Sequence, residues 1–322
     1  MAKSKADSKL KIVVLAGGIS HERDISLKSA RRVADALIEK SAEVIMREPD
    51  ADLLANLKKD SPDVIWPVLH GASGEDGALR EILSFTGIPF VGADSASAKL
   101  SWDKSIAKIV VGKAGIQTPR SITLPRETFK ELDASSILKL VTTSLQLPVV
   151  VKPARAGSAQ GVTIVKKQDQ LGQAMIDAYV YCDVAIIEDF IDGTELAVGV
   201  VDTGTGAKAL PAVEIRPRSG HFGFEERYLA GETDYFVPAR LTKAIAEKAA
   251  KVAIDAHKAL GLRHLSRVDM IVDAKGVPWF LEANVLPGLT ETSLLPQAIV
   301  ASGSTLGDVY YLLAQAALKG RG

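Results

Sequence analysis

Hydrophobic runs alternate with helical patterns along the first ninety residues. "KIVVLAGG" is a short apolar run that ends in paired glycines, which is typical of a buried strand entering a tight turn. The next segment, "SLKSARRVADALIEK", places its apolar residues at helical spacing. Further strand-like runs ("AEVIM", "DVIWPVL" and "PFVG") alternate with predicted helices near 50–59 and at "GALREILSFTG". This alternation predicts a parallel α/β unit over residues 10–92, with ligand-binding loops after the strand ends.

The pattern changes after a predicted helix, "SASAKLSWDKSIAKIVVGKAG", which ends at Gly115. Helices are then expected at 133–145, 168–181 and 239–260, and strands at "PVVVKP", "GVTIVK", "VAIIEDF", "TELAVGVVD" and "AKALPAVEI". A long aperiodic stretch, 216–238, is predicted to be an ordered lid, and the hairpin "RVDMIVDAKGVPWFLEANVL" precedes two more helices. We therefore expect an α/β and α+β protein with a disordered leader at 1–9, an N-terminal α/β domain at 10–94, a central subdomain at 95–187 and a C-terminal subdomain at 188–322.

The composition is that of a soluble globular protein, with 47% hydrophobic and 24% charged residues. The 39 Lys and Arg residues balance the 39 Asp and Glu residues, which argues against nucleic acid or an anionic membrane as a partner. The single cysteine, Cys182, excludes an internal disulfide framework and a multi-thiolate metal site. The apolar run at 12–16 is too short for a signal peptide, and no stretch approaches 18 apolar residues, so we expect a cytoplasmic protein without a membrane span.

The hairpin near the C-terminus carries acids in strand-like sequence. Side chains alternate faces along a strand, so Arg267 shares a face with Asp269, and Glu282 with Asn284. A turn with an even number of residues, centred on Lys275–Gly276, places Asp269 opposite Glu282 and Arg267 opposite Asn284. Opposed carboxylates repel each other, and a shared divalent cation such as Mg²⁺ would relieve that repulsion. The alternative is that these acids point to solvent from a half-buried strand.

A glycine-rich loop follows a buried strand in "VVVKPARAGSAQGVTIV" and places Lys152 at the end of that strand. Backbone N–H groups in such a loop approach phosphate oxygens closely, and the lysine supplies a positive charge. A strand follows the loop, so it is neither a Walker A loop nor a dinucleotide fingerprint, and a plain hairpin loop is the alternative. Glu188 and Glu195 flank "DFIDGT" and are candidates to bind the amino group and hydroxyls of a nucleotide, or else are solvated acids.

Taken in order over about residues 11–318, these segments resemble the ATP-grasp superfamily and, more narrowly, the D-alanine–D-alanine ligase family. "GGISHERDIS" resembles the N-terminal substrate loop of that family, and "LHGASGEDG" resembles its His-Gly…Gly-Glu-Asp-Gly segment. Later motifs are matched by "SWDKSIAK", "VVKPARAGSAQG", "IIEDFIDGTE", "EERYLAGETDYFVPA", "RVDMIVD" and "LEANVLPGLTETSLLP". The resemblance implies the ATP-grasp fold, with a Rossmann-like N-terminal domain and two α+β subdomains that sandwich ATP.

The resemblance also implies an activity, which is the ligation of two D-alanines for peptidoglycan precursor synthesis. ATP would phosphorylate the carboxylate of one D-alanine, and the amine of the second would attack the acyl phosphate, with release of ADP and phosphate. Asp269, Glu282 and Asn284 would hold two Mg²⁺ ions, for which Mn²⁺ can substitute. A homodimer is implied as well. The alternatives are a sibling ligase with D-lactate or D-serine as its second substrate, and a nucleotide-binding paralogue without catalysis.

Roles for individual residues follow from the matched motifs. At the nucleotide, the resemblance places Lys104 and Lys152 on the α- and β-phosphates and Arg227 on the γ-phosphate. It places Gly157 and Ser158 in the loop 155–161 that covers the phosphates. Around the adenosine it places Glu188, Phe190 and Glu195. At the substrates, it places Glu22 on the first ammonium with His70 nearby, Arg267 and the Gly288 N–H on the oxyanion, and Ser293 and the Leu294 N–H on the second carboxylate. Ser158 and Tyr228 would link with Glu22 to join the glycine-rich loop, the lid and the N-terminal domain.

The chain departs from the family pattern at four places. Arg227 replaces the usual lysine, and Ala159-Gln160 replaces a serine followed by an aliphatic residue. Asp189 replaces a common lysine or glutamate, and Val285 stands where threonine is frequent. These changes bear on rate and nucleotide affinity, whereas Tyr228 in the lid favours dipeptide over ester formation. A Rossmann dehydrogenase is disfavoured because "GGISHE" lacks the G-x-G-x-x-G spacing.

Overall fold

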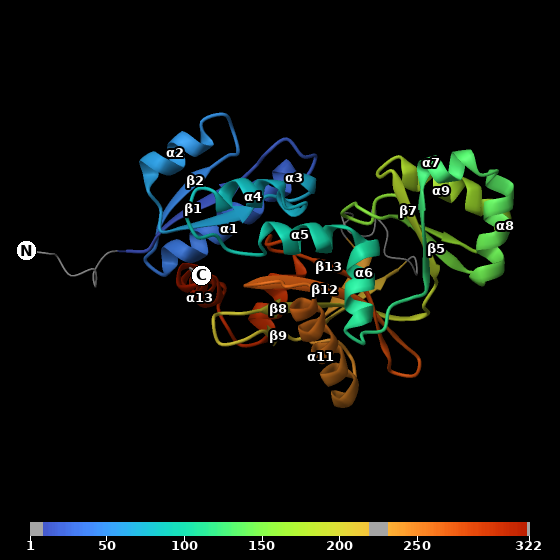
Figure 1. Ribbon diagram of the computed structural model, residues 1–322. Coiled ribbons are helices and arrows are strands. Elements are labelled where there is room, and N and C mark those ends of the chain that lie inside the picture. The colour runs from blue at the N-terminus through green and yellow to red at the C-terminus, as the bar shows by residue number, and fades with distance from the viewer. Residues whose placement is uncertain (1–8, 219–230, 321–322) are drawn as a thin grey trace, which may run out of the picture.

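A computed structural model describes residues 9–218 and 231–320 of the chain (Figure 1). The predicted leader at 1–9 therefore lies outside the described residues apart from its last position. The same holds for the centre of the expected lid, including Arg227 and Tyr228. The described chain forms three sheets, each covered by helices.

The first sheet is parallel, three-stranded and ordered β2-β1-β3, as the alternating pattern predicts. Its elements are β1 (Lys11–Ala16), α1 (Arg23–Glu39), β2 (Glu43–Arg47), α2 (Leu53–Asp60), β3 (Val64–Val68), α3 (Ala72–Glu75) and α4 (Ala78–Ser84). The strand expected at "PFVG" is reduced to one isolated bridge, between Ile65 and Phe90. Pro89 has no N–H to donate, and Gly92, at φ +98°, turns the chain away two residues after the bridge.

The second sheet is antiparallel and ordered β4-β7-β5-β6. It contains β4 (Ser121–Pro125), β5 (Val149–Pro153), β6 (Thr163–Val165) and β7 (Val184–Asp189), with helices α7 (Arg126–Glu131), α8 (Ala134–Ser144), η2 (Gln168–Gln170) and α9 (Leu171–Tyr179). Its core lies between the strands and helices α8 and α9, where Val151, Leu171 and Met175 are fully buried.

The third sheet has six strands in the order β11-β10-β8-β12-β13, with β9 paired to β8. Its strands are β8 (Gly193–Val201), β9 (Lys208–Ala209), β10 (Val213–Pro217), β11 (Thr233–Phe236), β12 (Leu265–Asp273) and β13 (Pro278–Asn284). Helices α5 (Ser95–Trp102), α6 (Lys104–Lys113), α11 (Lys243–Ala259) and α12 (Leu294–Ala301) pack on it, and α13 (Leu306–Lys319) packs against α12. The run expected as one strand at "AKALPAVEI" is two strands, because Pro211 cannot donate to the ladder.

The single helix expected over "SASAKLSWDKSIAKIVVGKAG" is two helices. Asp103 separates α5 from α6 with extended dihedral angles (φ −89°, ψ 102°). Its carboxylate accepts hydrogen bonds from the backbone N–H groups of Ser105 and Ile106, and therefore caps a new helix. As a result α6 begins at Lys104, beside the site described below.

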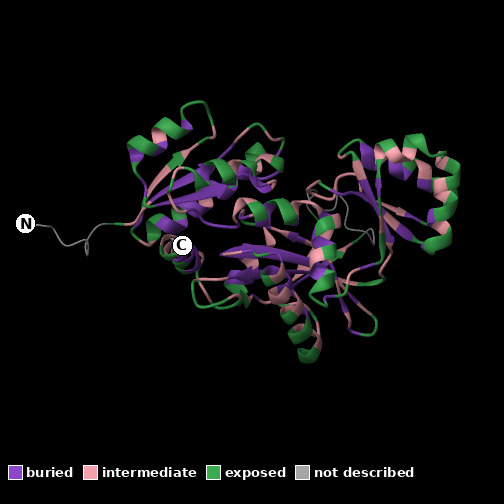
Figure 2. Ribbon diagram, viewed as in Figure 1, coloured by how far each residue is buried: buried purple, intermediate pink, exposed green. Residues whose placement is uncertain are grey.

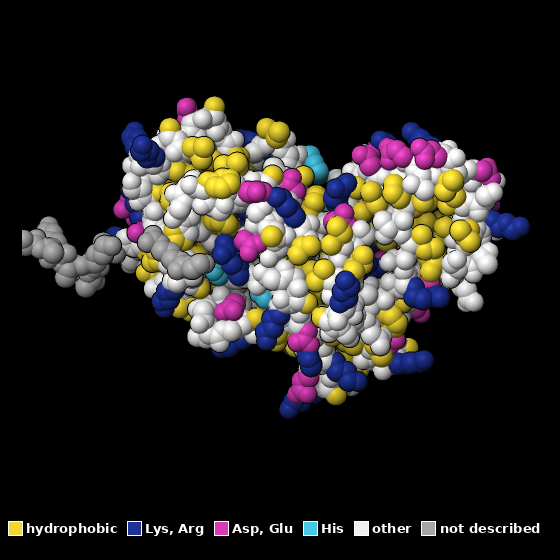
Figure 3. Space-filling view, in the orientation of Figure 1, with side chains coloured by type: hydrophobic (Ala, Val, Ile, Leu, Met, Phe, Trp, Pro, Cys, Tyr) yellow, Lys and Arg dark blue, Asp and Glu magenta, His cyan; other side chains and the backbone are white. Residues whose placement is uncertain are grey.

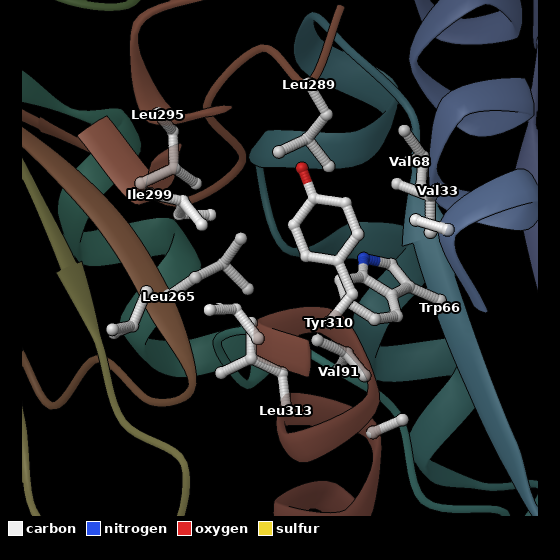
Figure 4. Packing of buried hydrophobic residues seen from close by; sticks show 14 of the residues in the cluster. Val33, Trp66, Val68, Val91, Leu265, Leu289, Leu295, Ile299, Tyr310 and Leu313 are labelled. Atoms are coloured by element: carbon white, nitrogen blue, oxygen red, sulfur yellow. The ribbon is translucent and has the colours of Figure 1, made fainter. Parts of the chain in front are cut away.

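The first and third sheets share one core. Helix α13, at the C-terminal end of the chain, packs against α1 and β3, far from it in sequence. Tyr310 of α13 meets Trp66 of β3 edge to face, with ring centroids 5.3 Å apart (Figure 4). Figure 2 shows that buried residues lie along the strands of all three sheets, whereas exposed residues lie on the outer faces of the helices. This shared core fixes the N-terminal sheet beside β12 and β13.

Charged side chains of both signs are interspersed over the face of the molecule seen in Figure 3. Within the described residues, no helix combines the length and apolar character needed to cross a membrane.

Candidate active site

The structure brings the described site candidates together around two adjoining cavities. The first, of about 510 Å³, is lined by β5, β7, β8, β10 and the acid hairpin β12–β13. The second, of about 740 Å³, is lined by α1, the acid hairpin and the segment before α12. Residues predicted for the nucleotide line the first (Lys104, Lys152, Gly157, Glu188, Phe190 and Glu195), and residues predicted for the substrates line the second (Glu22, His70, Ser158, Arg267, Gly288, Ser293 and Leu294).

The acid hairpin has the predicted register, reached by a different route. Asp269 lies opposite Glu282, and Arg267 lies opposite Asn284. The turn between Val272 and Pro278 contains residues 273–277, an odd number rather than the even number expected. A bulge next to Asp269 adds one residue to β13 and restores the predicted pairing. The two acids therefore face each other where the two cavities meet.

Both of the opposed acids, Asp269 and Glu282, have a cationic partner. Arg267 donates from Nε and Nη2 to the two carboxylate oxygens of Asp269, both at 2.7 Å. Lys104 Nζ lies 3.1 Å from Glu282 Oε2. Burial alone would lower the pKa of Arg267, but Asp269 outweighs it and holds that pKa above its ordinary value. The carboxylate repulsion expected from the sequence is thus already balanced by protein cations.

The hairpin also fits a hard metal ion bound together with phosphates. Asp269, Glu282 and Asn284 contribute only oxygen ligands, and all three line the second cavity. Among the described residues, no cluster of three or more His, Cys, Asp or Glu side chains forms a closed metal cage. Two carboxylates and an amide suit Mg²⁺, which takes one or two protein carboxylates and completes its shell with water and substrate phosphates. The donor set therefore fits the predicted ion.

Glu188 sits between two lysines at the back of the first cavity. Lys152, at the end of β5, places its Nζ 2.6 Å from Oε1 of Glu188, and Lys108 of α6 pairs with Oε2. Burial would raise the pKa of Glu188, but the two lysines outweigh it and hold that pKa below its ordinary value. Lys108 is a site residue that we did not predict from the sequence. The sequence feature that could have identified Lys108 is its spacing of four residues from Lys104 in "SWDKSIAK", because this spacing puts both lysines on one face of a helix.

The glycine-rich loop is tied to the N-terminal turn across the second cavity. Ser158 donates its hydroxyl proton to Oε1 of Glu22 at 2.6 Å, so the structure pairs these two predicted residues. Gln160 Nε2 lies 3.1 Å from His21 Nε2. Both Ser158 and Ala159 adopt φ of +55°, a left-handed conformation that is costly for residues with a Cβ.

Three of the four departures from the family pattern have structural counterparts, and the first is the left-handed Ala159 with the contact from Gln160 to His21. Asp189 accepts a hydrogen bond from Nε of Arg120 at 2.7 Å, at the edge of the first cavity. Val285 is 2% exposed and packs in the core with Leu286, so an apolar side chain suits this position.

The segment after β3 holds His70 and a buried acid, Glu75, which is the last residue of α3. His70 lies 3.1 Å from the hydroxyl of Ser29, and its burial lowers its pKa. Glu75 accepts a hydrogen bond from the Gly71 N–H at 2.8 Å, and burial raises the pKa of this acid to about 8. Glu75 belongs to the Gly-Glu-Asp-Gly segment, but its sequence alone predicts no role for it. Both groups line the second cavity.

Gly74 is the packing constraint that sets the shape of this segment. An added Cβ would lie 1.6 Å from the carbonyl oxygen of Leu69, which is backbone and cannot move aside cheaply. We expect Gly74→Ala to lower the free energy of unfolding by about 3 kcal/mol or more, measured by urea denaturation. The control is Gly112→Ala in α6, where the nearest atom is 3.9 Å away and helix propensity favours alanine by roughly 0.5–1 kcal/mol. An unchanged urea midpoint in Gly74→Ala would contradict this packing argument.

The start of α12 forms the far wall of the second cavity. Ser293 is the N-cap residue of α12, and its hydroxyl accepts a hydrogen bond from the Thr290 N–H at 3.0 Å instead of capping the helix. The first turn of the helix therefore offers backbone N–H donors, starting with Leu294. An added Cβ on Gly288 would lie 2.6 Å from Oγ of Ser293, so the backbone of Gly288 approaches this serine closely. The arrangement suits an anionic group.

Three helix-covered sheets, with a nucleotide-sized cavity between the second and third and a lysine-flanked glycine-rich loop over it, define an ATP-grasp protein. Residues 110–314 match the family model described as D-ala D-ala ligase C-terminus. The chain is also 38% identical to the D-alanine–D-alanine ligase of Geotalea uraniireducens, over 96% of each protein. The chain belongs to the D-alanine–D-alanine ligase family.

Other known proteins agree with this assignment. The D-alanine–D-alanine ligase of Bordetella petrii is 37% identical over 96% of this chain and 93% of its own length. The crystal structure of VanG D-Ala:D-Ser ligase from Enterococcus faecalis superposes with a TM-score of 0.83 at 29% identity, covering 96% of this chain and all of that one. The D-alanine–D-alanine ligase of Bacillus anthracis complexed with ATP gives a TM-score of 0.81 at 28% identity, covering 97% and 98%. The fold expected from the sequence is confirmed.

Proposed function

We propose that the protein joins two D-alanines to D-alanyl-D-alanine at the expense of ATP, and so supplies a peptidoglycan precursor. The observation that carries the proposal is the position of Lys104, Asp269 and Glu282, which line both cavities at once. A terminal phosphate in the first cavity and a carboxylate in the second would meet at these three residues. Full-length similarity to D-alanine–D-alanine ligases supports the choice of substrates.

In the first step, the ATP phosphates lie under the glycine-rich loop. Lys104 and Lys152 offset charge on the α- and β-phosphates, and Gly157 and Ser158 provide backbone N–H groups. Asp269, Glu282 and Asn284 would hold two Mg²⁺ ions, which would neutralise charge on the transferred phosphoryl group when bound. Glu188 and Glu195 bind the amino group and hydroxyls of the adenosine, and Phe190 packs beside the base.

The first D-alanine lies in the second cavity with its ammonium on Glu22. Ser158 holds the Glu22 carboxylate in place through their 2.6 Å hydrogen bond. A carboxylate oxygen of this D-alanine attacks the γ-phosphorus, and the bond from that phosphorus to ADP breaks. The product of this step is an acyl phosphate, which must be kept from water.

The second D-alanine binds with its carboxylate at Ser293 and the Leu294 N–H. Its amine attacks the carbonyl carbon of the acyl phosphate, and phosphate leaves as the peptide bond forms. Arg267 and the Gly288 N–H stabilise the negative charge that develops on the carbonyl oxygen. The attacking amine gives up a proton as the peptide bond forms, and the departing phosphate is a base that takes it.

Several further expectations belong to the same proposal. Arg227 acts on the γ-phosphate, and Tyr228 joins Glu22 and Ser158 when the lid 216–238 covers the acyl phosphate. Mn²⁺ substitutes for Mg²⁺, the protein acts as a homodimer, and its use of ATP places the reaction in the cytoplasm. The division at residues 94 and 187 separates the N-terminal, central and C-terminal parts.

A D-Ala:D-Ser or D-Ala:D-lactate ligase is the second candidate, favoured by the structural likeness to the Enterococcus faecalis D-Ala:D-Ser ligase. Mass analysis of the products formed from ATP, Mg²⁺ and D-alanine tests the main proposal. Adding equal D-serine, or equal D-lactate at pH 6, to the same mixture separates the candidates.

A further inference from the structure

Lys108 is a buried cation that lines neither of the two cavities of the site. Its side chain is 4% exposed, and its Nζ pairs with Oε2 of Glu188. The carbonyl oxygen of Pro119 lies 3.5 Å from the same Nζ. Glu188 lines the first cavity, whereas Lys108 stands behind it and does not. Lys108 therefore reaches a bound nucleotide only through Glu188.

The Lys108–Glu188 pair joins two different parts of the fold. Ala107 and Val111 of α6 are buried in the core of the six-stranded sheet. Glu188 lies on β7, the strand between β4 and β5 in the four-stranded sheet, where it pairs with Ser121 and Val150. Figure 1 shows α6 between these two sheets. One of the two cations that hold the Glu188 carboxylate thus comes from outside its own sheet.

Two cations share Glu188 in the structure, but only Lys108 is free to stay there when a nucleotide binds. Lys152 lines the first cavity at the end of β5, and its Nζ holds Oε1 of Glu188 at 2.6 Å. Phosphates in that cavity attract Lys152, which exposes Oε1. Lys108 then remains as the cation that keeps the buried carboxylate charged and oriented.

We propose that Lys108 is a positioning residue that keeps Glu188 a fixed, acceptor-only carboxylate and thereby selects adenine over guanine nucleotides. The proposal rests on the proposed use of ATP at this site. Adenine carries an amino group at position 6, which donates to a carboxylate, whereas guanine carries a carbonyl oxygen there. A charged carboxylate accepts hydrogen bonds and donates none, so it pairs with the first group and repels the second. Without Lys108, Glu188 can gain a proton, and a protonated carboxyl group also donates a hydrogen bond. It would then bind the guanine carbonyl oxygen as well, so the preference for adenine weakens.

The test compares ATP with GTP as phosphoryl donors for wild-type protein and for Lys108→Met. We expect the KM for ATP to rise about 10-fold while kcat stays within about threefold, and the ratio of kcat/KM for ATP over GTP to fall at least about 10-fold. Lys108→Arg keeps the charge and is expected to restore that ratio to within about threefold of wild type. Lys113→Met is the matched control, because Lys113 is an exposed lysine at the end of the same helix, and its ratio is expected not to change.

A double variant shows whether Lys108 acts through Glu188, and it also covers the case in which Lys108→Met fails to fold. Removing one member of a buried ion pair leaves the other uncompensated, so each variant is first checked by thermal unfolding. Glu188→Gln alone is expected to lower the ATP-over-GTP ratio, because an amide both accepts and donates. Adding Lys108→Met to Glu188→Gln removes both charges and is expected to lower the ratio no further.

Three outcomes would overturn the proposal. These are a folded Lys108→Met protein with wild-type nucleotide preference, an equal loss of preference in Lys113→Met, and fully additive losses in the double variant. A wild-type protein that releases no phosphate from ATP in the presence of D-alanine would instead overturn the proposed function, so the two failures are distinguishable.

Discussion

Glu282→Gln is expected to lower D-alanine-dependent phosphate release by about 100-fold or more while the protein stays folded. Glu282 is half-buried where the two cavities meet, opposite Asp269 on the neighbouring strand. The substitution keeps the size of the side chain but removes the charge that holds Mg²⁺ and the partner of Lys104. Steady-state phosphate release at saturating ATP and D-alanine measures the effect, and thermal unfolding reports on the fold.

Glu291→Gln is the matched control, because Glu291 is an exposed acid that lines the second cavity away from the hairpin. We expect this control to keep wild-type turnover. Near wild-type phosphate release from a folded Glu282→Gln protein would contradict the assignment of Glu282 as a metal ligand.

Arg267→Lys is expected to lower kcat by about 100- to 1,000-fold, the loss typical of removing one oxyanion donor. The planar guanidinium of Arg267 holds both oxygens of Asp269 and leaves further N–H groups for the reacting carbonyl. Lysine keeps the positive charge beside the buried Asp269, so the fold is expected to survive. A single ammonium group cannot bind both oxygens of Asp269 and also donate to the reacting carbonyl as the guanidinium does. The developing oxyanion therefore loses a donor.

Arg47→Lys breaks a similar pair outside the site and serves as the control. Arg47 donates from Nε and Nη2 to the two oxygens of Asp60, at 2.8 and 2.9 Å. We expect this variant to keep wild-type kcat. A similar loss in both variants would show that Arg267 acts on stability alone, and full activity in Arg267→Lys would remove it from the oxyanion site.

The acid hairpin illustrates what the sequence can predict. Alternation of side chains predicts which residues share a face of each strand, whereas the pairing of Asp269 with Glu282 was predicted from the assumed turn. The bulge was not foreseen, since nothing in "PWFLEAN" marks the residue that is added. The predicted even number of turn residues was wrong, but the predicted register was right. The bulge in β13 compensates for the odd number of residues in the turn.

Lys108 illustrates what the sequence cannot predict. A lysine in a helical pattern is ordinarily exposed, and its burial here depends on how α6 packs against a sheet more than 80 residues further along the chain. The division of α5 from α6 at Asp103 has a local cause, because the Asp103 carboxylate caps α6. This cap can be recognised in the sequence once the start of the helix is known. The contact between Glu22 and Ser158, 136 residues apart, was placed by resemblance to a family and not by any local pattern.

The central claim is tested most directly by mass analysis of the products that the purified protein forms from ATP, Mg²⁺ and D-alanine. The account predicts D-alanyl-D-alanine in equal amount to ADP and phosphate, with no ADP formed when D-alanine is left out. With D-serine or D-lactate added at equal concentration, the dipeptide of two D-alanines is still expected as the main product. A mixed dipeptide or an ester as the main product, or ADP release that does not require D-alanine, would contradict the account.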